Sequence, residues 1–126
     1  MSDAKKILIA EDEEAMLSAL VSKFEKSGFE VISAQDGEEG LTKALEEKPD
    51  ILMLDIIMPK IDGLELIKKI REYKWGAHVP IIILTNLSDA YNISEAGKYG
   101  VYDFLVKTDW RLDDIVKLAK EKLNVI

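Results

Sequence analysis

Five short apolar runs recur along the chain, and the segments between them carry apolar residues at helical spacing. The runs are KILIA (6–10), EVISA (30–34), ILMLD (51–55), PIIIL (80–84) and YDFLV (102–106). Regular alternation of strands and helices predicts a parallel sheet, because parallel neighbours need crossover connections, and right-handed crossovers place helices on both faces. We therefore predict an α/β fold in which a doubly wound, five-stranded parallel sheet of order 2-1-3-4-5 is flanked by five helices.

The five predicted helices lie between and after these runs. Their apolar repeats cover residues 16–24, 41–45, 64–70, 88–97 and 112–123. Asp36 and Asp62 stand where the second and third helices begin, and Ser88 stands where the fourth begins. Short polar side chains at such positions accept hydrogen bonds from the unpaired amides of the first turn, so we expect these residues to cap their helices.

Composition limits what the chain can do. With 126 residues, 48% of them hydrophobic, the length fits a single domain over 1–126 with an ordinary core. The absence of cysteine excludes disulfides, thiolate metal sites and cysteine nucleophiles, and it fits a cytoplasmic location. We expect no membrane association, because no apolar run approaches the length of a membrane span. A net charge of -7 disfavours direct binding of nucleic acid.

Acidic side chains follow two of the predicted strands. Glu11 and Asp12 come directly after the first run, and Asp55 closes the third. In a doubly wound sheet, ligands bind outside the carboxyl ends of the strands, at the switch point between strands one and three. Three carboxylates in one crevice repel one another unless a cation compensates, and an open site of hard oxygen ligands favours Mg²⁺.

An alternative interpretation assigns the acidic run EDEE (11–14) to the start of the first helix, where negative charge favours the helix dipole. Against it stand Thr85, directly after the fourth run, and Lys107, directly after the fifth. Functional groups at four strand ends indicate phosphoryl chemistry. Asp55 can attack phosphorus, Lys107 and the metal can neutralise the phosphoryl oxygens, and Thr85 can donate a hydrogen bond to one of them. The product would be an aspartyl phosphate.

At these residues the chain resembles a response-regulator receiver domain of two-component signalling, of the single-domain, chemotaxis-regulator-like kind. The resemblance covers about residues 6–123. Its motifs are the acid pair 11–12, the segment LDIIMPKIDG (54–63), Thr85 and the segment DFLVK (103–107). The resemblance implies a flavodoxin-like receiver fold and a phosphoacceptor switch. It implies no enzymatic activity other than the domain's own phosphotransfer and autodephosphorylation.

By this resemblance, Asp55 accepts a phosphoryl group from a phosphohistidine on a sensor histidine kinase or phosphotransfer protein. The implied cofactor is Mg²⁺, with Mn²⁺ as an alternative. The implied metal ligands are Asp12, Asp55, the backbone carbonyl of Ile57 and, through water, Glu11.

The resemblance also implies a switch made by Thr85 and Phe104. Their movement would alter the surface formed by the predicted helix 88–97, strand 102–106 and helix 112–123, which a downstream partner protein would read. The implied assembly is a monomer or a homodimer promoted by phosphorylation. Phe104 can alternatively be an ordinary strand residue packed beneath the fourth helix.

Several residues depart from the family's pattern. Thr108 replaces the usual proline after the lysine, and a cis bond without proline costs about 3 to 4 kcal/mol, so we predict a trans Lys107–Thr108 bond. Asn86 is larger than the usual residue, and it either crowds the phosphoryl pocket or offers it an amide donor. Ile57 and Leu87, at positions that tune dephosphorylation, are apolar and cannot orient an attacking water. We predict a long-lived phosphoaspartate.

Three other functions are alternatives, and the last two of them conflict with specific residues. A phosphorylation-independent interaction domain is compatible with Thr108 and Asn86. A phosphatase of the haloacid-dehalogenase type would need a second aspartate where the chain has Ile57. A flavin carrier would need a phosphate-binding loop after the first strand, where the chain has four acids at 11–14.

Overall fold

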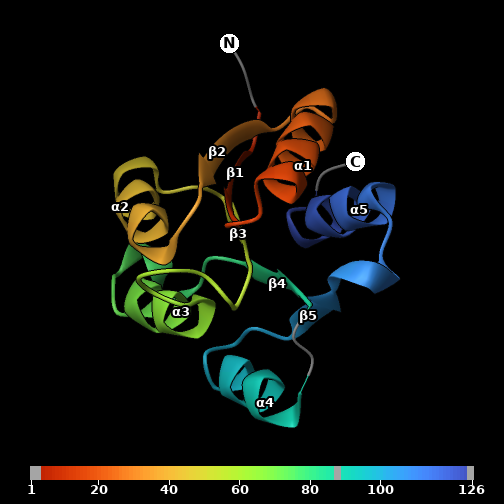
Figure 1. Ribbon diagram of the computed structural model, residues 1–126. Coiled ribbons are helices and arrows are strands. Elements are labelled where there is room, and N and C mark those ends of the chain that lie inside the picture. Colours follow the sequence, from red (N-terminus) through yellow and green to blue (C-terminus); the bar gives the residue numbers. More distant parts are fainter. Residues whose placement is uncertain (1–3, 87–88, 125–126) are drawn as a thin grey trace.

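A computed structural model describes residues 4–86 and 89–124 of the chain. In these ranges five strands form one parallel sheet of order β2-β1-β3-β4-β5, with five α-helices around it (Figure 1). The strands are β1 (Lys6–Ala10), β2 (Glu30–Ala34), β3 (Ile51–Leu54), β4 (Ile81–Thr85) and β5 (Asp103–Val106). The helices are α1 (Glu14–Lys26), α2 (Gly37–Glu47), α3 (Gly63–Arg71), α4 (Ala90–Lys98) and α5 (Leu112–Lys122), with short 3-10 turns η1 (Trp75–Ala77) and η2 (Lys107–Asp109). The predicted fold class and strand order are confirmed.

The strand register brings distant residues to one edge of the sheet. Ala10 of β1 pairs with Leu54 of β3, so the residues that follow these two strands emerge side by side. Thr85 of β4 pairs with Val106 of β5, which puts the next residue, Lys107, at the same edge. The carboxyl ends of the four neighbouring strands therefore meet above β1 and β3.

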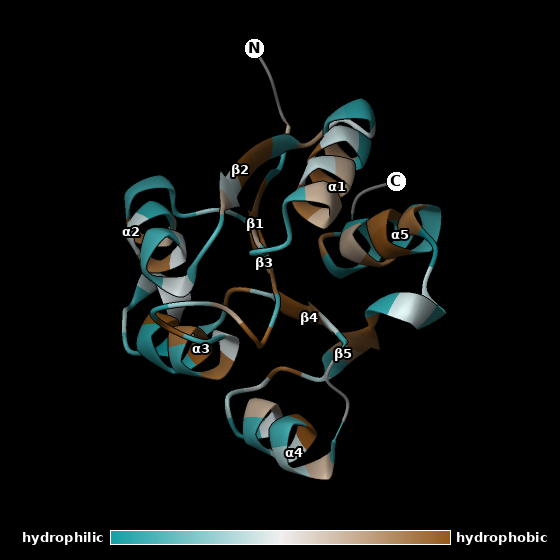
Figure 2. Cartoon of the chain, in the orientation of Figure 1, coloured by the Kyte–Doolittle hydropathy of each residue, from teal (hydrophilic) through white to brown (hydrophobic). Residues whose placement is uncertain are grey.

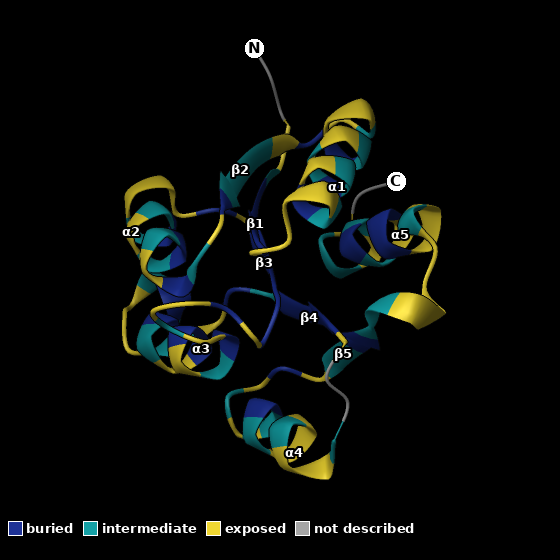
Figure 3. Ribbon diagram, viewed as in Figure 1, coloured by how far each residue is buried: buried dark blue, intermediate teal, exposed yellow. Residues whose placement is uncertain are grey.

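Two apolar clusters, one on each face of the sheet, hold the layers together. Alternate strand residues separate between them, because successive side chains of a strand point to opposite faces: Leu8 packs in the cluster under α2, α3 and α4, whereas Ile7 and Ile9 pack in the cluster under α1 and α5. Apolar residues line the strands and the inner sides of the helices (Figure 2). The central strands β1, β3 and β4 are largely buried, the edge strands β2 and β5 are only partly buried, and the outer sides of the helices are exposed (Figure 3).

Aspartates cap three of the helices. Asp36 accepts a hydrogen bond from Glu39 N at the start of α2, and Asp62 accepts one from Glu65 N at the start of α3, as predicted. Helix α4 is capped by Asp89. The predicted cap, Ser88, lies outside the described residues, and α4 begins one residue later than that prediction requires.

The start of α3 is packed tightly against the end of β3. A Cβ atom on Gly63 would lie 2.3 Å from the carbonyl oxygen of Asp55 and 2.8 Å from Cα of Ile56. Only glycine permits this approach, and Gly63 N also donates a hydrogen bond to Ile56 O at 2.8 Å. The first turn of α3 thereby fixes the backbone that carries Asp55.

Within the described ranges, no helix combines the length and the apolar character needed to cross a membrane.

Candidate functional site

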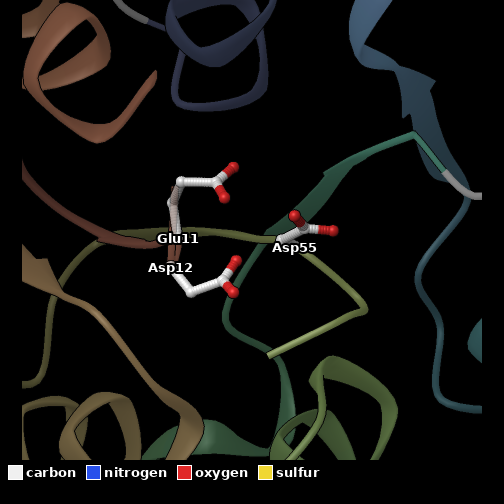
Figure 4. Close-up of side chains that lie close together, drawn as sticks. All are labelled: Glu11, Asp12 and Asp55. Atoms are coloured by element: carbon white, nitrogen blue, oxygen red, sulfur yellow. The ribbon is translucent and has the colours of Figure 1, made fainter. Parts of the chain in front are cut away.

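Three carboxylates meet where β1 and β3 end. Oxygen atoms of Glu11, Asp12 and Asp55 all lie within 4.8 Å of one another (Figure 4). Glu11 and Asp55 are buried, with 2% and 6% of their surface exposed, whereas Asp12 is exposed. The structure therefore brings together the three acids that the strand ends predict, and it leaves one of them open to solvent.

Lys107 lies against two of these acids. Its Nζ atom is 2.9 Å from Oδ2 of Asp55 and 2.5 Å from Oε1 of Glu11, and its side chain is 8% exposed. Burial opposes the charged form of Lys107, but hydrogen bonds and attraction to the two carboxylates outweigh it and raise its pKa. The lysine is therefore held as a cation beside Asp55.

Glu11 and Asp55 are also held by backbone amides. Glu13 N donates to Oε2 of Glu11 at 3.0 Å, and Ile57 N donates to Oδ1 of Asp55 at 3.3 Å. Burial raises the pKa of Glu11, although the hydrogen bonds from Lys107 and the Glu13 amide oppose this shift. A nearby cation stabilises the charged form of such a buried acid.

A pocket of about 240 Å³ opens at this edge of the sheet. It is lined by Glu11, Asp12, Glu13, Asp55, Ile57, Thr85, Asn86 and Lys107. Thr85 is fully buried at the end of β4, whereas the side chain of Ile57 is 59% exposed at the mouth. The described residues contain no cis peptide bond, so the predicted trans Lys107–Thr108 bond is confirmed.

The predicted switch residue Phe104 does not line the pocket. It lies on β5, is half-buried, and packs against the apolar cluster under α2, α3 and α4. Its neighbour Tyr102 is 81% exposed. The other predicted tuning residue, Leu87, lies outside the described residues.

The donor atoms of the pocket suit a hard divalent cation. Carboxylate oxygens and backbone carbonyls are the ligands that Mg²⁺ takes in proteins, and Mg²⁺ needs only one or two carboxylates because it keeps several waters. The exposed Asp12 and the open mouth leave room for those waters. The residues present therefore fit the ion.

Glu13 is a pocket residue that the sequence did not single out. The sequence assigns Glu13 only to the acidic start of a helix, whereas in the structure its carboxylate lies 3.7 Å from Nζ of Lys107. The signal available in the sequence was its position, three residues after the strand end at Ala10 and directly after the two acids Glu11 and Asp12.

Comparison with known proteins supports the same fold. The family model of the response regulator receiver domain matches residues 7–120. The chain is 41% identical over 103 residues to the alkaline phosphatase synthesis transcriptional regulatory protein PhoP of Bacillus subtilis, a match that covers 82% of this chain and 42% of that protein. The chain thus spans about two fifths of the length of this curated relative.

Two solved structures illustrate the likeness. A CheY-like response regulator receiver domain protein from Methanospirillum hungatei superposes with a TM-score of 0.90 at 28% identity, over 97% of this chain and 95% of that one. A chain of the CheX-CheY-BeF3-Mg²⁺ complex from Borrelia burgdorferi superposes with a TM-score of 0.84 at 26% identity, over 94% of this chain and 89% of that one. With the family match over residues 7–120, these likenesses show that the chain belongs to the response regulator receiver domains of two-component systems.

Proposed function

We propose that Asp55 is the phosphoacceptor of this receiver domain and that it receives its phosphoryl group, in a Mg²⁺-dependent reaction, from a phosphohistidine on a sensor histidine kinase or phosphotransfer protein. The observation that carries the proposal is the contact of 2.9 Å between Lys107 Nζ and Asp55 Oδ2, beside Glu11 and Asp12. It supplies a nucleophilic carboxylate, a cation for the phosphoryl oxygens and acids for a metal in one pocket.

In the proposed step, a carboxylate oxygen of Asp55 attacks phosphorus while the bond from phosphorus to the imidazole nitrogen breaks. The electron pair of that bond returns to the imidazole ring, and an acyl phosphate forms on Asp55. The Lys107 ammonium moves from the carboxylates to a phosphoryl oxygen, and the Thr85 hydroxyl donates to another. The donor histidine is left free.

The residues proposed to hold Mg²⁺ are Asp12, Asp55 and the backbone carbonyl of Ile57, with Glu11 acting through water. The bound ion would neutralise charge on the phosphoryl oxygens. Mg²⁺ accompanies beryllofluoride in the Borrelia burgdorferi complex, which supports the same pairing here.

The proposed output is a change at the surface formed by α4, β5 and α5. Thr85 and Phe104 would transmit the change, since Thr85 lines the pocket on β4 and Phe104 lies on the neighbouring strand β5, paired with Ile83. Exposed Tyr91 and Tyr102 give that surface the aromatic character common at protein interfaces. A downstream partner protein, a homodimer promoted by phosphorylation, a single-domain organisation over 1–126 and a cytoplasmic location stay predictions.

The test is incubation with Mg²⁺ and acetyl phosphate, followed by measurement of intact mass. We expect the wild type to gain one phosphate and Asp55→Ala to gain none. Asp114→Ala, which removes an exposed acid of α5, should gain one phosphate like the wild type. An unmodified wild type that still binds a partner would instead indicate a phosphorylation-independent interaction domain.

A further inference from the structure

Glu13 occupies an unusual position for a glutamate. It is the N-cap residue of α1, yet its side chain makes no capping hydrogen bond. N-cap positions favour Ser, Thr, Asp and Asn, whose short side chains reach the amides of the first turn. The carboxylate of Glu13 lies instead toward Lys107, with Oε1 3.7 Å from Nζ, and its side chain is 61% exposed. It therefore sits at the mouth of the pocket that holds Asp55.

This extra acid changes the charge of the pocket. Four of the lining side chains are carboxylates (Glu11, Asp12, Glu13, Asp55) and one is an ammonium (Lys107), which gives a net charge of -3. A single dication reduces this to -1. Without the charge of Glu13, the loaded pocket would be neutral.

A phosphoryl donor must approach Asp55 past this remaining net charge of -1. Acetyl phosphate is a dianion near neutral pH, whereas donors with a phosphorus–nitrogen bond, such as phosphoramidate, carry a smaller net charge because the nitrogen is protonated. Repulsion within a few ångströms of a partly exposed carboxylate amounts to roughly 1 kcal/mol per pair of unit charges, and it falls as salt is added. A dianion therefore loses more from Glu13 than a monoanion does.

We propose that Glu13 is a specificity-determining residue, which disfavours dianionic acyl phosphates relative to phosphorus–nitrogen donors. The proposal rests on the proposed function, because it concerns transfer to Asp55. Glu13 acts through charge at the mouth and takes no part in the bond changes at phosphorus.

The test compares phosphorylation rates of the wild type, Glu13→Gln and Glu14→Gln with acetyl phosphate and with phosphoramidate. Glu14 is the matched control, because it is the adjacent exposed acid and does not line the pocket. Its substitution by glutamine removes the same charge as Glu13→Gln does. Magnesium dissociation constants, measured for each variant by NMR titration, allow the rates to be compared at equal occupancy.

We expect Glu13→Gln to raise the rate with acetyl phosphate by roughly three- to tenfold, and the rate with phosphoramidate by clearly less. The difference should shrink as ionic strength rises, and Glu14→Gln should change neither rate appreciably. An equal gain with both donors, or the same gain in Glu14→Gln, would overturn the proposal. If the wild type and both variants gain no more phosphate than Asp55→Ala does, the proposed function itself is wrong.

Discussion

The ammonium of Lys107 lies 2.9 Å from the carboxylate of Asp55, although 52 residues separate them along the chain. The parallel register produces this contact, because both residues follow strand ends at the same edge of the sheet. Lys107 is the single cation among the described residues that line the pocket. The acids around it are therefore only partly compensated, and their mutual repulsion lowers the stability of the fold.

The first prediction concerns metal addition. A ligand that binds only the folded state stabilises it, so Mg²⁺ at a hundredfold excess over its dissociation constant should raise the free energy of unfolding by about 2.7 kcal/mol. Asp12→Asn should be slightly more stable than the wild type without metal and should lose most of the gain with Mg²⁺. Urea unfolding with and without Mg²⁺ measures both effects. An undiminished gain in Asp12→Asn would show that the ion binds elsewhere, and Asp114→Asn serves as control.

The second prediction concerns the lifetime of the phosphoaspartate. Ile57 lines the pocket mouth with a side chain that cannot orient a water molecule. We expect Ile57→Asn to shorten the lifetime at least about tenfold, because an amide can position the attacking water. Decay of phosphorylated intact mass over time gives the rate. Ile93→Asn replaces another half-exposed isoleucine outside the pocket and should leave the lifetime unchanged. Hydrolysis of the wild type within seconds would contradict the prediction.

The third prediction concerns Gly63. In Gly63→Ala the new methyl group would overlap backbone atoms of Asp55 and Ile56, so the loop after β3 must shift. We expect a loss of about 2 kcal/mol in the free energy of unfolding and a lower rate of phosphorylation. Gly97→Ala is the control: its Cβ would make an ordinary contact with Tyr102 at 3.7 Å, and alanine favours the helix by about 1 kcal/mol. Chemical denaturation measures the change in the free energy of unfolding for both variants, and the two changes should have opposite signs.

The fourth prediction concerns Arg71, at the end of α3. Its guanidinium donates hydrogen bonds to the carbonyl oxygens of Tyr99 at 2.8 Å, Gly76 at 2.8 Å and Val79 at 2.7 Å. Arg71→Met should cost about 2 kcal/mol of stability, because three acceptors lose a charged donor. Arg71→Lys should retain only part of the stability lost in Arg71→Met, since an ammonium cannot reproduce the planar arrangement of donors. Full recovery with lysine in denaturation experiments would show that charge alone matters.

The fifth prediction concerns pH and Asp89. Hydrogen bonds from the backbone and side chain of Asn92 hold the pKa of Asp89 below its usual range. Because the folded pKa is below the unfolded one, the cap contributes stability above the unfolded pKa and loses it as pH falls through the folded pKa. NMR titration of the carboxyl group should show the lowered pKa. Asn92→Ala should raise it part of the way, and an unchanged pKa in that variant would contradict the assignment of the side-chain bond.

Much of the fold follows from the sequence because the signals are redundant. Buried parallel strands require continuous apolar runs, and each run coincides with an observed strand to within a residue at either end. The differences have local causes: proline has no amide to donate, so β4 begins at Ile81 rather than at Pro80. The start of α4 was harder to predict, because Ser88 and Asp89 are adjacent residues that can both serve as caps.

The position of the site also follows from the sequence, because strand ends at one edge must converge. Side-chain direction does not follow. Whether Glu13 caps α1 or lies toward Lys107 depends on the neighbouring charges, which spacing does not encode. The half-burial of Phe104 depends on how α4 packs across β5, and the weakly apolar sequence of α4 leaves that contact undetermined.

Three of the residues that depart from the family's pattern lie in the described part of the chain, and all three are exposed: Ile57 and Asn86 follow strand ends, and Thr108 lies in the 3-10 turn η2. Substitutions at exposed positions of this kind usually change stability by less than about 0.5 kcal/mol. We therefore expect that substitutions at these positions can change the lifetime of the phosphoaspartate without compensating changes in the two apolar clusters. On this expectation, the timing of a signal and the stability of the fold would depend on largely separate sets of residues.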